Sequence, residues 1–255
     1  MTKKYPHFVG LALSACLFTS TYALNMSSIG TPYIGGFANY TNNQYTSELT
    51  YNSDSGRSHA SYSGILNSQG AKTMLSGGGL LIGIEHKINN NFSIGIDINY
   101  SVNNSKTKIP PTIIALTDPD QLQQTLQNTS NISFDIKAIT TLTPNNDIFF
   151  QVGPSFGQFK QEFSVEDPDT TVGNSIKWEN KFNKTGINFG FGLTHQFTKQ
   201  FSALLEWSTV YYGKYTIPKK TKIDPDAPND ESNNISTGSL SPQMNALRFG
   251  LIYKF

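Results

Sequence analysis

In the last eleven residues of the chain, 245–255, large apolar side chains occupy every second position, and the positions between them are mostly small or charged. Reading back from the end, the apolar residues occupy every second position: Phe255, Tyr253, Leu251, Phe249 and Leu247. The positions between them hold Lys254, Ile252, Gly250, Arg248 and Ala246. Because successive side chains of a strand point to opposite faces, this pattern predicts a strand with one face in an apolar environment. An ordinary amphipathic edge strand that ends in phenylalanine is the alternative interpretation.

The first residues, 1–23, have the organisation of a secretory signal peptide. A charged start precedes an apolar run at 8–18, which is too short to cross a bilayer as a helix, and small residues lead to a predicted cleavage after Ala23. Acylation of Cys16, as in a lipoprotein signal, is the alternative. With cleavage after Ala23, the mature chain 24–255 is expected to form a single domain without cysteine.

The composition excludes one class of partner and favours a chain rich in strands. The formal net charge is +1 and charged residues make up 15% of the sequence, so no nucleic acid is expected as a partner. Aromatic residues at 12%, together with 21 glycines, suit strands joined by polar connections. No stretch reaches eighteen consecutive apolar residues, so no membrane-spanning helix is predicted. A membrane barrel would also lack such a stretch, because only its outer face must be apolar.

Eight segments carry a two-residue apolar period and are predicted as strands. The clearest runs from Phe92 to Val102, where six apolar residues alternate with five polar or small ones. In chain order the predicted strands are 32–40, 74–86, 92–102, 131–142, 148–163, 183–197, 201–217 and 245–255.

The connections between these strands alternate in length. Polar loops are predicted at 41–72, 103–130, 164–179 and 218–242, with a hairpin extension as an alternative within 41–72 and a possible short helix at 118–128. Tight turns are predicted at 87–91, 143–147 and 198–200. Outer-membrane barrels have short periplasmic turns and longer extracellular loops, whereas soluble sandwiches follow no such rule. The pattern therefore predicts an all-β fold: an eight-stranded antiparallel up-and-down transmembrane β-barrel with short periplasmic turns and long extracellular loops.

The chain resembles the small eight-stranded outer-membrane barrels of the OmpA-transmembrane, opacity-protein and surface-antigen type. The resemblance rests on four stretches: residues 33–36 (YIGG), 93–100 (SIGIDINY), 204–207 (LLEW) and 253–255 (YKF). It implies a place in the bacterial outer membrane, in contact with outer-membrane lipid and lipopolysaccharide. It also implies that the barrel-assembly machinery reads the closing strand through Arg248, Gly250, Tyr253 and Phe255.

Charged residues inside OmpA-type barrels pair and plug the lumen, and this chain matches the family at three of those positions. Asp97, Lys137 and Glu206 match, whereas Thr194 and Leu204 stand where the family has an acid and an arginine. Arg248 is a candidate replacement for the missing cation. All four side chains fall on inward positions of their predicted strands, and unpaired charges there would be costly to desolvate, so Asp97, Lys137, Glu206 and Arg248 are expected to form one paired network across the interior. Because their strands are neighbours, Asp97 can meet Lys137 directly if their heights match, and Glu206 is expected near Arg248.

The sequence offers little for catalysis. His86 and His195 are predicted at strand ends on the periplasmic side, away from the outer leaflet where a lipid-modifying Ser/His site would need its base. No two histidines have the spacing of a metal pair, and no glycine motif for phosphate is present, so neither a metal nor a cofactor is expected. Asp97, Glu206 and Glu85 are interpreted as ion-paired fillers and not as an acid/base pair.

Three classes of function remain. We expect a non-enzymatic barrel with a structural and surface-exposed, adhesin- or antigen-like role, which binds an unknown extracellular or host partner through its loops. A small solute channel or porin is the alternative, and an outer-membrane lipid-modifying enzyme is a further one.

Overall fold

The computed structural model describes residues 30–55, 58–68, 77–104, 106–113, 121–166, 175–217, 220–223 and 232–255. The predicted signal peptide at 1–23, with Cys16, lies outside these residues. Every regular element in the described ranges is a β-strand. These ranges contain no helix long and apolar enough to cross a membrane.

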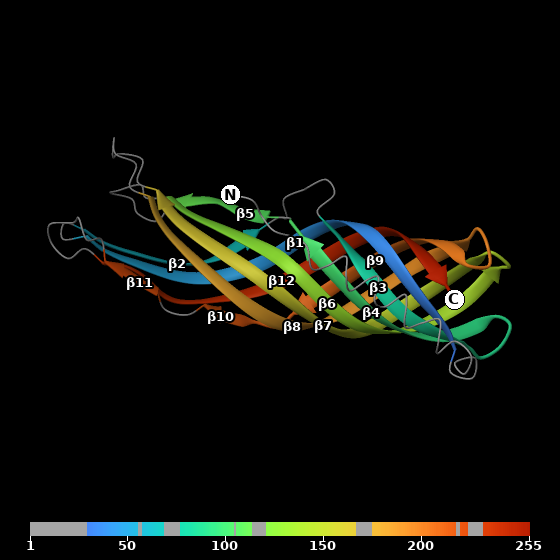
Figure 1. Cartoon of the computed structure of the whole chain (residues 1–255). Helices are drawn as coiled ribbons and strands as arrows, with labels where there is room; N and C mark the ends of the chain where they lie inside the picture. Colours follow the sequence, from blue (N-terminus) through green and yellow to red (C-terminus); the bar gives the residue numbers. More distant parts are fainter. Residues whose placement is uncertain are drawn as a thin grey trace, which may run out of the picture.

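Eight antiparallel strands close into a ring, as the sequence predicts (Figure 1). Consecutive strands of the ring pair with one another, and the first pairs with the last to complete the barrel. The ring strands are β1 (Thr31–Ser55), β3 (Gly77–Lys87), β4 (Phe92–Asn103), β6 (Gln121–Thr143), β7 (Asn146–Glu166), β8 (Ser175–Gln196), β9 (Phe201–Tyr212) and β12 (Ser232–Lys254).

Several ring strands extend far beyond their predicted ends, and further strands pair with these extensions. At the end where Figure 1 labels β2 and β11, the β1–β12 ladder continues to the pair Asp54 and Ser232. The added strands are β2 (Ser58–Ser68) on β1, β5 (Lys106–Ile113) on β6, and β10 (Tyr215–Ile217) and β11 (Lys220–Ile223) on β12. We call this part of the molecule the strand extension.

The strand extension corrects the prediction of long polar loops. The segments 41–72, 103–130, 164–179 and 218–242 all contain paired strands, and the possible helix at 118–128 is strand from Gln121 onward. The apolar period did not reveal these strands because a ladder surrounded by water needs no continuous apolar face. The backbone hydrogen bonds of an antiparallel ladder form with polar side chains as well as with apolar ones.

The connections at the opposite end are short. They comprise residues 88–91, 144–145 and 197–200, and backbone hydrogen bonds such as Ile88 N to Phe92 O at 3.0 Å close them. The carboxy terminus lies at this end, where the Phe255 amide donates to the Pro32 carbonyl at 3.1 Å. We call it the short-turn end.

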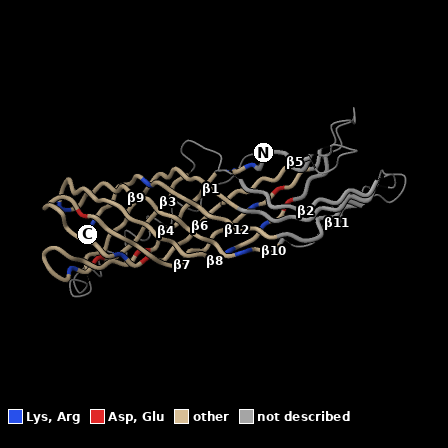
Figure 2. The backbone as a smooth tube through the Cα atoms, turned by 180° about the vertical axis from the view of Figure 1, so that it is seen from behind, with Lys and Arg blue, Asp and Glu red and all other residues tan. Residues whose placement is uncertain are grey.

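The outer surface of the ring carries an apolar band. Large apolar side chains point outward from seven of the ring strands and are 36% or more exposed. Examples are Ile82, Ile96, Ile136, Phe150, Phe191, Leu205 and Leu251. Soluble proteins rarely expose so large an apolar surface, so the band requires an apolar surrounding. Charged residues lie mainly toward the two ends of the described barrel, with a largely uncharged stretch between them (Figure 2).

Candidate functional site: the barrel interior

The interior next to the short-turn end is built around Asp97 and Lys137. Asp97 on β4 forms an ion pair with Lys137 on β6 and accepts a hydrogen bond from the Tyr33 hydroxyl on β1. Tyr33 reaches Asp97 across β3, where Gly83 has no side chain to block it. The ammonium group of Lys137 also lies 4.4 Å from the centre of the Phe149 ring, a favourable cation–π geometry.

A second buried ion pair joins β9 to β12. Glu206 and Arg248 are direct partners in the ladder, and Arg248 Nη1 donates to Glu206 Oε1 at 2.7 Å. Both side chains are 1% exposed. Gln151 of β7 donates to the same carboxylate oxygen at 2.9 Å, and the guanidinium carbon lies 5.0 Å from the centre of the Phe37 ring. Each charge therefore meets an opposite charge, as buried charges require.

The four charged residues named from the sequence meet as two direct ion pairs, Asp97 with Lys137 and Glu206 with Arg248. No hydrogen bond or ion pair among the described residues links Asp97 and Lys137 to Glu206 and Arg248. A third pair, Glu85 and Lys254, has 2.8 Å between its charged atoms and bridges β3 and β12 across the intervening β1.

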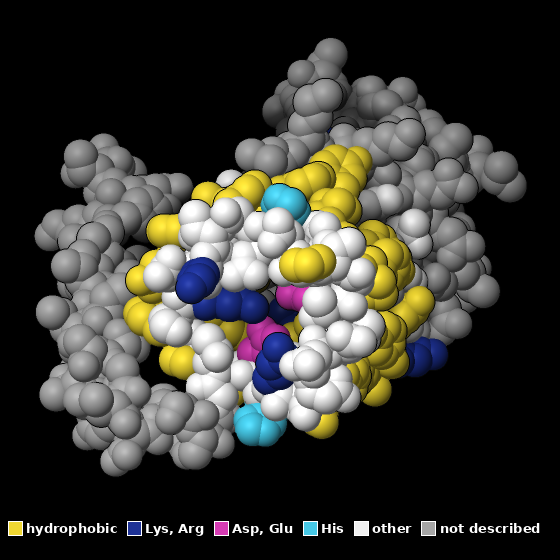
Figure 3. Space-filling view, turned by 90° about the vertical axis from the view of Figure 1, so that its right-hand side faces the viewer, with side chains coloured by type: hydrophobic (Ala, Val, Ile, Leu, Met, Phe, Trp, Pro, Cys, Tyr) yellow, Lys and Arg dark blue, Asp and Glu magenta, His cyan; other side chains and the backbone are white. Residues whose placement is uncertain are grey.

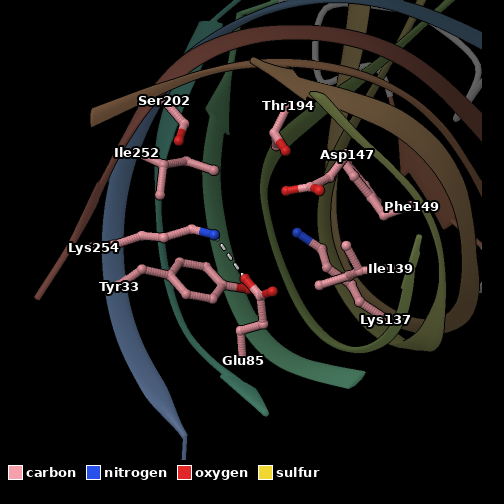
Figure 4. Close-up of a pocket in the computed structure, with 10 residues that line it drawn as sticks. All are labelled: Tyr33, Glu85, Lys137, Ile139, Asp147, Phe149, Thr194, Ser202, Ile252 and Lys254. Atoms are coloured by element: carbon pink, nitrogen blue, oxygen red, sulfur yellow. Dashed lines mark hydrogen bonds and ion pairs between the residues drawn. The ribbon is translucent and has the colours of Figure 1, made fainter. Parts of the chain in front are cut away.

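The short-turn end has a central hollow that acidic and basic side chains line, and histidine side chains lie at the outer edge of this end (Figure 3). The close-up in Figure 4 places Glu85, Lys254, Lys137 and Asp147 around this space, together with Tyr33. The partly open cavity among these side chains has a volume of about 20 Å³. Such a volume holds one water molecule, not a metabolite.

Polar side chains fill the middle of the interior. Apolar side chains fill the part of the interior that lies nearer the strand extension. The polar level contains buried amides and hydroxyls, for example Asn99, Ser133 and Asn188. Beyond it, the Phe159 ring stacks on Phe182 at 5.2 Å and meets Tyr212 edge-on at 4.8 Å. Further buried apolar residues of this level are Tyr45, Leu126, Phe163, Leu240 and Met244.

Asp135 is a buried carboxylate that the sequence reasoning left out of the interior network. It is 1% exposed and accepts hydrogen bonds from Asn99 Nδ2 at 2.9 Å, Ser133 Oγ at 2.6 Å and Asn188 Nδ2 at 2.8 Å. Its inward position follows from the alternation with Lys137. Its position opposite Asp97 does not, because it depends on the register between β4 and β6.

The residues of the expected assembly signal lie on both faces of β12. Tyr253 and Phe255 point outward with their rings 5.1 Å apart, while Arg248 points inward. Gly250 faces inward beside β1, where a Cβ would lie 2.6 Å from the Gly36 carbonyl oxygen. His86 and His195 lie beside the short turns, and His195 Nδ1 is 2.8 Å from Asn146 Oδ1. Within the described residues, no cluster of three or more His, Cys, Asp or Glu could hold a metal.

An antiparallel ring of strands with an apolar outer band and a polar, charged interior defines a transmembrane β-barrel. The family model described as "Outer membrane protein beta-barrel domain" matches residues 9–255. The chain belongs to this family, and the protein resides in the bacterial outer membrane.

Solved structures similar to this chain include other outer-membrane proteins. The attachment invasion locus protein Ail of Yersinia pestis aligns at 10% identity and a TM-score of 0.39, over 89% of this chain and 99% of Ail. The outer membrane protease OmpT of Escherichia coli aligns at 9% identity and a TM-score of 0.42, over 88% and 97%. OprG of Pseudomonas aeruginosa aligns at 10% identity and a TM-score of 0.38, over 89% and 96%. A comparison with curated proteins found no match.

Proposed function

We propose that the protein is a closed, non-enzymatic outer-membrane barrel whose strand extension presents a surface for binding outside the cell. The observation that carries the proposal is the filling of the interior along its length. The largest side chains below 2% exposure point into it from many strands: Arg248, Leu81, Leu126, Leu240, Met244, Gln124, Gln151 and Gln161. A barrel of eight strands is narrow enough for side chains to fill it, and this closure argues against the passage of solutes.

The strand extension supports the second half of the proposal. Short turns of such barrels face the periplasm, which places the extension outside the cell. Among the residues of β7 whose exposure is described, up to Ser164, Phe156 is the last exposed large apolar one, and the β7–β8 ladder continues to the pair Glu166 and Ser175. The outward residues beyond Phe156 include Lys160 and Glu162, so this surface suits water and a polar partner.

Shortening one hairpin of the strand extension tests the binding role. Lys160 and Lys181 are direct partners in the β7–β8 ladder, so replacing residues 161–180 by Asn-Gly should leave a two-residue hairpin in register. We expect the shortened barrel to assemble normally and to lose binding of expressing cells to host cells or serum factors. The hairpins of β1–β2 and β5–β6 are then shortened in the same way, one at a time. Normal binding by every one of these shortened proteins would reject the binding role.

We propose lipopolysaccharide as the lipid partner on the outer face of β6, β7 and β8. A pocket of about 470 Å³ lies there just beyond the apolar band, lined by Thr129, Gln158, Lys160, Lys181 and Asn183 with parts of Phe159 and Phe182. Lys160 Nζ lies 2.7 Å from Glu162 and 3.0 Å from Glu179, and the hydrogen bond with Glu162 raises the pKa of Lys160. Lys160 and Lys181 are both cations at neutral pH, and we assign them to contact with headgroup phosphates.

The lipid contact is tested by the thermal stability of the barrel in vesicles with and without lipopolysaccharide. We expect lipopolysaccharide to raise the unfolding temperature of the natural protein more than that of Lys160→Gln with Lys181→Gln. Lys199→Gln, in a short turn at the opposite end, is the matched control. An equal rise in all three proteins would show that these lysines do not hold the headgroup.

The small-channel alternative draws on one observation. Several buried polar atoms of the middle level have no hydrogen-bond partner within the described residues, including Ser101 Oγ, Gln151 Oε1 and Ser208 Oγ. Water molecules in a continuous column through the barrel would supply hydrogen bonds to these atoms. Such a column would conduct ions, and a conductance measurement would detect the current.

A further inference from the structure

The outward side chains of the β7–β8 ladder change in chemistry in a fixed order along its length. From the apolar band toward the strand extension, the direct partners are Phe156 with Thr185, Gln158 with Asn183, Lys160 with Lys181, and Glu162 with Glu179. An exposed aromatic ring is therefore followed by a level of two amides, a level of two cations and a level of two carboxylates. The pocket of about 470 Å³ on this face lies at the amide and cation levels.

The cation level presents two lysines side by side. Like charges directly opposite each other weaken a ladder, so Lys160 opposite Lys181 is not a feature that the fold itself favours. The carboxylates hold these lysines from the side away from the band: Lys160 Nζ lies 2.7 Å from Glu162 Oε1, and Lys181 Nζ lies 3.4 Å from Glu179 Oε1. Both lysines line the pocket, whereas neither carboxylate does. The charged side chains of the lining are therefore two cations, which fit an anion.

The amide level supplies hydrogen-bond donors between these cations and the band. Gln158 and Asn183 both line the pocket. The Ser130 hydroxyl donates to Gln158 Oε1 at 3.1 Å, and no hydrogen bond within the described residues uses the NH2 group of Gln158. Asn183 is exposed, so its amide is also open to a ligand. Amides both donate and accept hydrogen bonds, which suits the hydroxyl groups of a sugar.

We propose that this pocket is a subsite for a phosphorylated sugar of an outer-leaflet glycolipid. Lys160 and Lys181 bind the phosphate, and Gln158 and Asn183 bind the sugar ring that carries it. This assignment rests on the proposed contact with lipopolysaccharide and names the part of the lipid that is recognised. The pocket has the volume of a small-ligand site, large enough for a sugar with its phosphate.

The order of the levels matches the order of groups in such a lipid. A glycolipid with a phosphorylated sugar presents acyl chain, sugar and phosphate outward from the membrane, and the ladder presents an aromatic ring, amides and cations. A phosphate monoester carries a charge of about −1.5 to −2 at neutral pH, which two lysines match. A phospholipid fits less well, because its phosphodiester carries one charge and glycerol offers no sugar hydroxyls to the amide level.

The subsite is tested by thermal unfolding of the full barrel in phosphatidylcholine vesicles. The vesicles contain either diphosphoryl lipid A or phosphatidylglycerol at equal phosphate content. A lipid that binds only the folded state raises the unfolding temperature, and we expect lipid A to raise it more than phosphatidylglycerol does. Gln158→Ala with Asn183→Ala should lose this advantage of lipid A and respond equally to the two lipids. The control, Asn90→Ala with Gln200→Ala, removes two exposed amides from the short turns and should keep the advantage.

The outcomes separate the sugar subsite from the lipid contact. If neither lipid raises the unfolding temperature of the natural protein, the lipid contact itself is overturned, and the subsite with it. An equal rise with the two lipids leaves the lipid contact in place and overturns the subsite, and this comparison needs no variant. An advantage of lipid A that persists in full when Gln158 and Asn183 are both alanine also overturns the subsite.

Discussion

Glu206 and Arg248 stand directly opposite each other in the β9–β12 ladder, and their charged atoms meet inside the barrel at 2.7 Å. Asp97 and Lys137 meet differently. Lys137 is opposite Gly95, so its side chain runs diagonally over the glycine to Asp97. Both pairs join neighbouring strands of the ring, and each is closed off from solvent.

The two pairs should therefore behave as two separate energetic units. We expect Lys137→Met to cost about 3–5 kcal/mol of unfolding free energy, because Asp97 loses its cation while it remains buried. The double change Asp97→Asn with Lys137→Met should cost less, with a coupling energy of about 1–3 kcal/mol. The same double-mutant cycle on Glu206 and Arg248 should give a similar coupling energy. A cycle that combines one residue of each pair should give a coupling energy close to zero. Zero coupling within both pairs would mean that water solvates each charge independently.

Gly83 and Gly95 both point into the interior but have different space around them. A Cβ at Gly83 would lie 2.5 Å from Tyr33, in the path of the Tyr33–Asp97 hydrogen bond. A Cβ at Gly95 would have its nearest neighbours at 3.4 and 3.5 Å, which is ordinary contact. We expect Gly83→Ala to destabilise the barrel by about 1–3 kcal/mol through overpacking. Gly95→Ala should be neutral or slightly stabilising in the same urea unfolding assay, and a larger loss at Gly95 would contradict the described packing.

The outer face of β4 should tolerate apolar but not charged residues. Ile96 is 55% exposed on the apolar band, so Ile96→Arg should cost about 2–4 kcal/mol in a lipid bilayer. Ile96→Leu is the control and should fold with nearly unchanged stability. If arginine at position 96 is as well tolerated as leucine, this face does not contact lipid.

The terminal aromatic residue is expected to matter for assembly more than for the stability of the finished barrel. Phe255 is 47% exposed, and its backbone bond to Pro32 is a small part of the β1–β12 seam. We predict that deleting Phe255 lowers the outer-membrane yield in cells and leaves unfolded protein in the periplasm. Refolding of the same variant into lipid in vitro should proceed nearly as for the natural chain. Full yield in cells with normal heat-modifiable migration would show that Phe255 is not part of the signal.

The strands inside the apolar band could be predicted from sequence because lipid imposes a strict pattern on them. Ile94, Ile96 and Ile98 face outward and Asp97 and Asn99 face inward, as the alternation of 92–102 requires. The strand extension has no such signal, because water surrounds it and polar residues are accepted on its outer face. Its paired segments, such as 41–55 on β1, consequently read as loops.

The contents of the interior could be predicted only in part. Alternation shows that Asp97, Asp135 and Lys137 point inward, but the height of each depends on the register between strands. That register places Asp97 opposite Asp135 and leaves Lys137 one step away on the same face. The hydrogen bond from Tyr33 to Asp97, which comes from two strands away, could not be predicted either, because it depends on the register of β1 and β3 as well.

The conductance of the purified barrel in a planar lipid bilayer tests the closed interior most directly. Leu81, Gln151 and Arg248 are among the largest buried side chains that fill the interior. We therefore predict no discrete conductance steps for the natural protein. Replacing Glu206 and Arg248 together by alanine should remove the largest buried side chain and its partner, and small steps should then appear. Steady unitary steps from the natural protein, unchanged by this double substitution, would contradict the closed barrel and favour the channel.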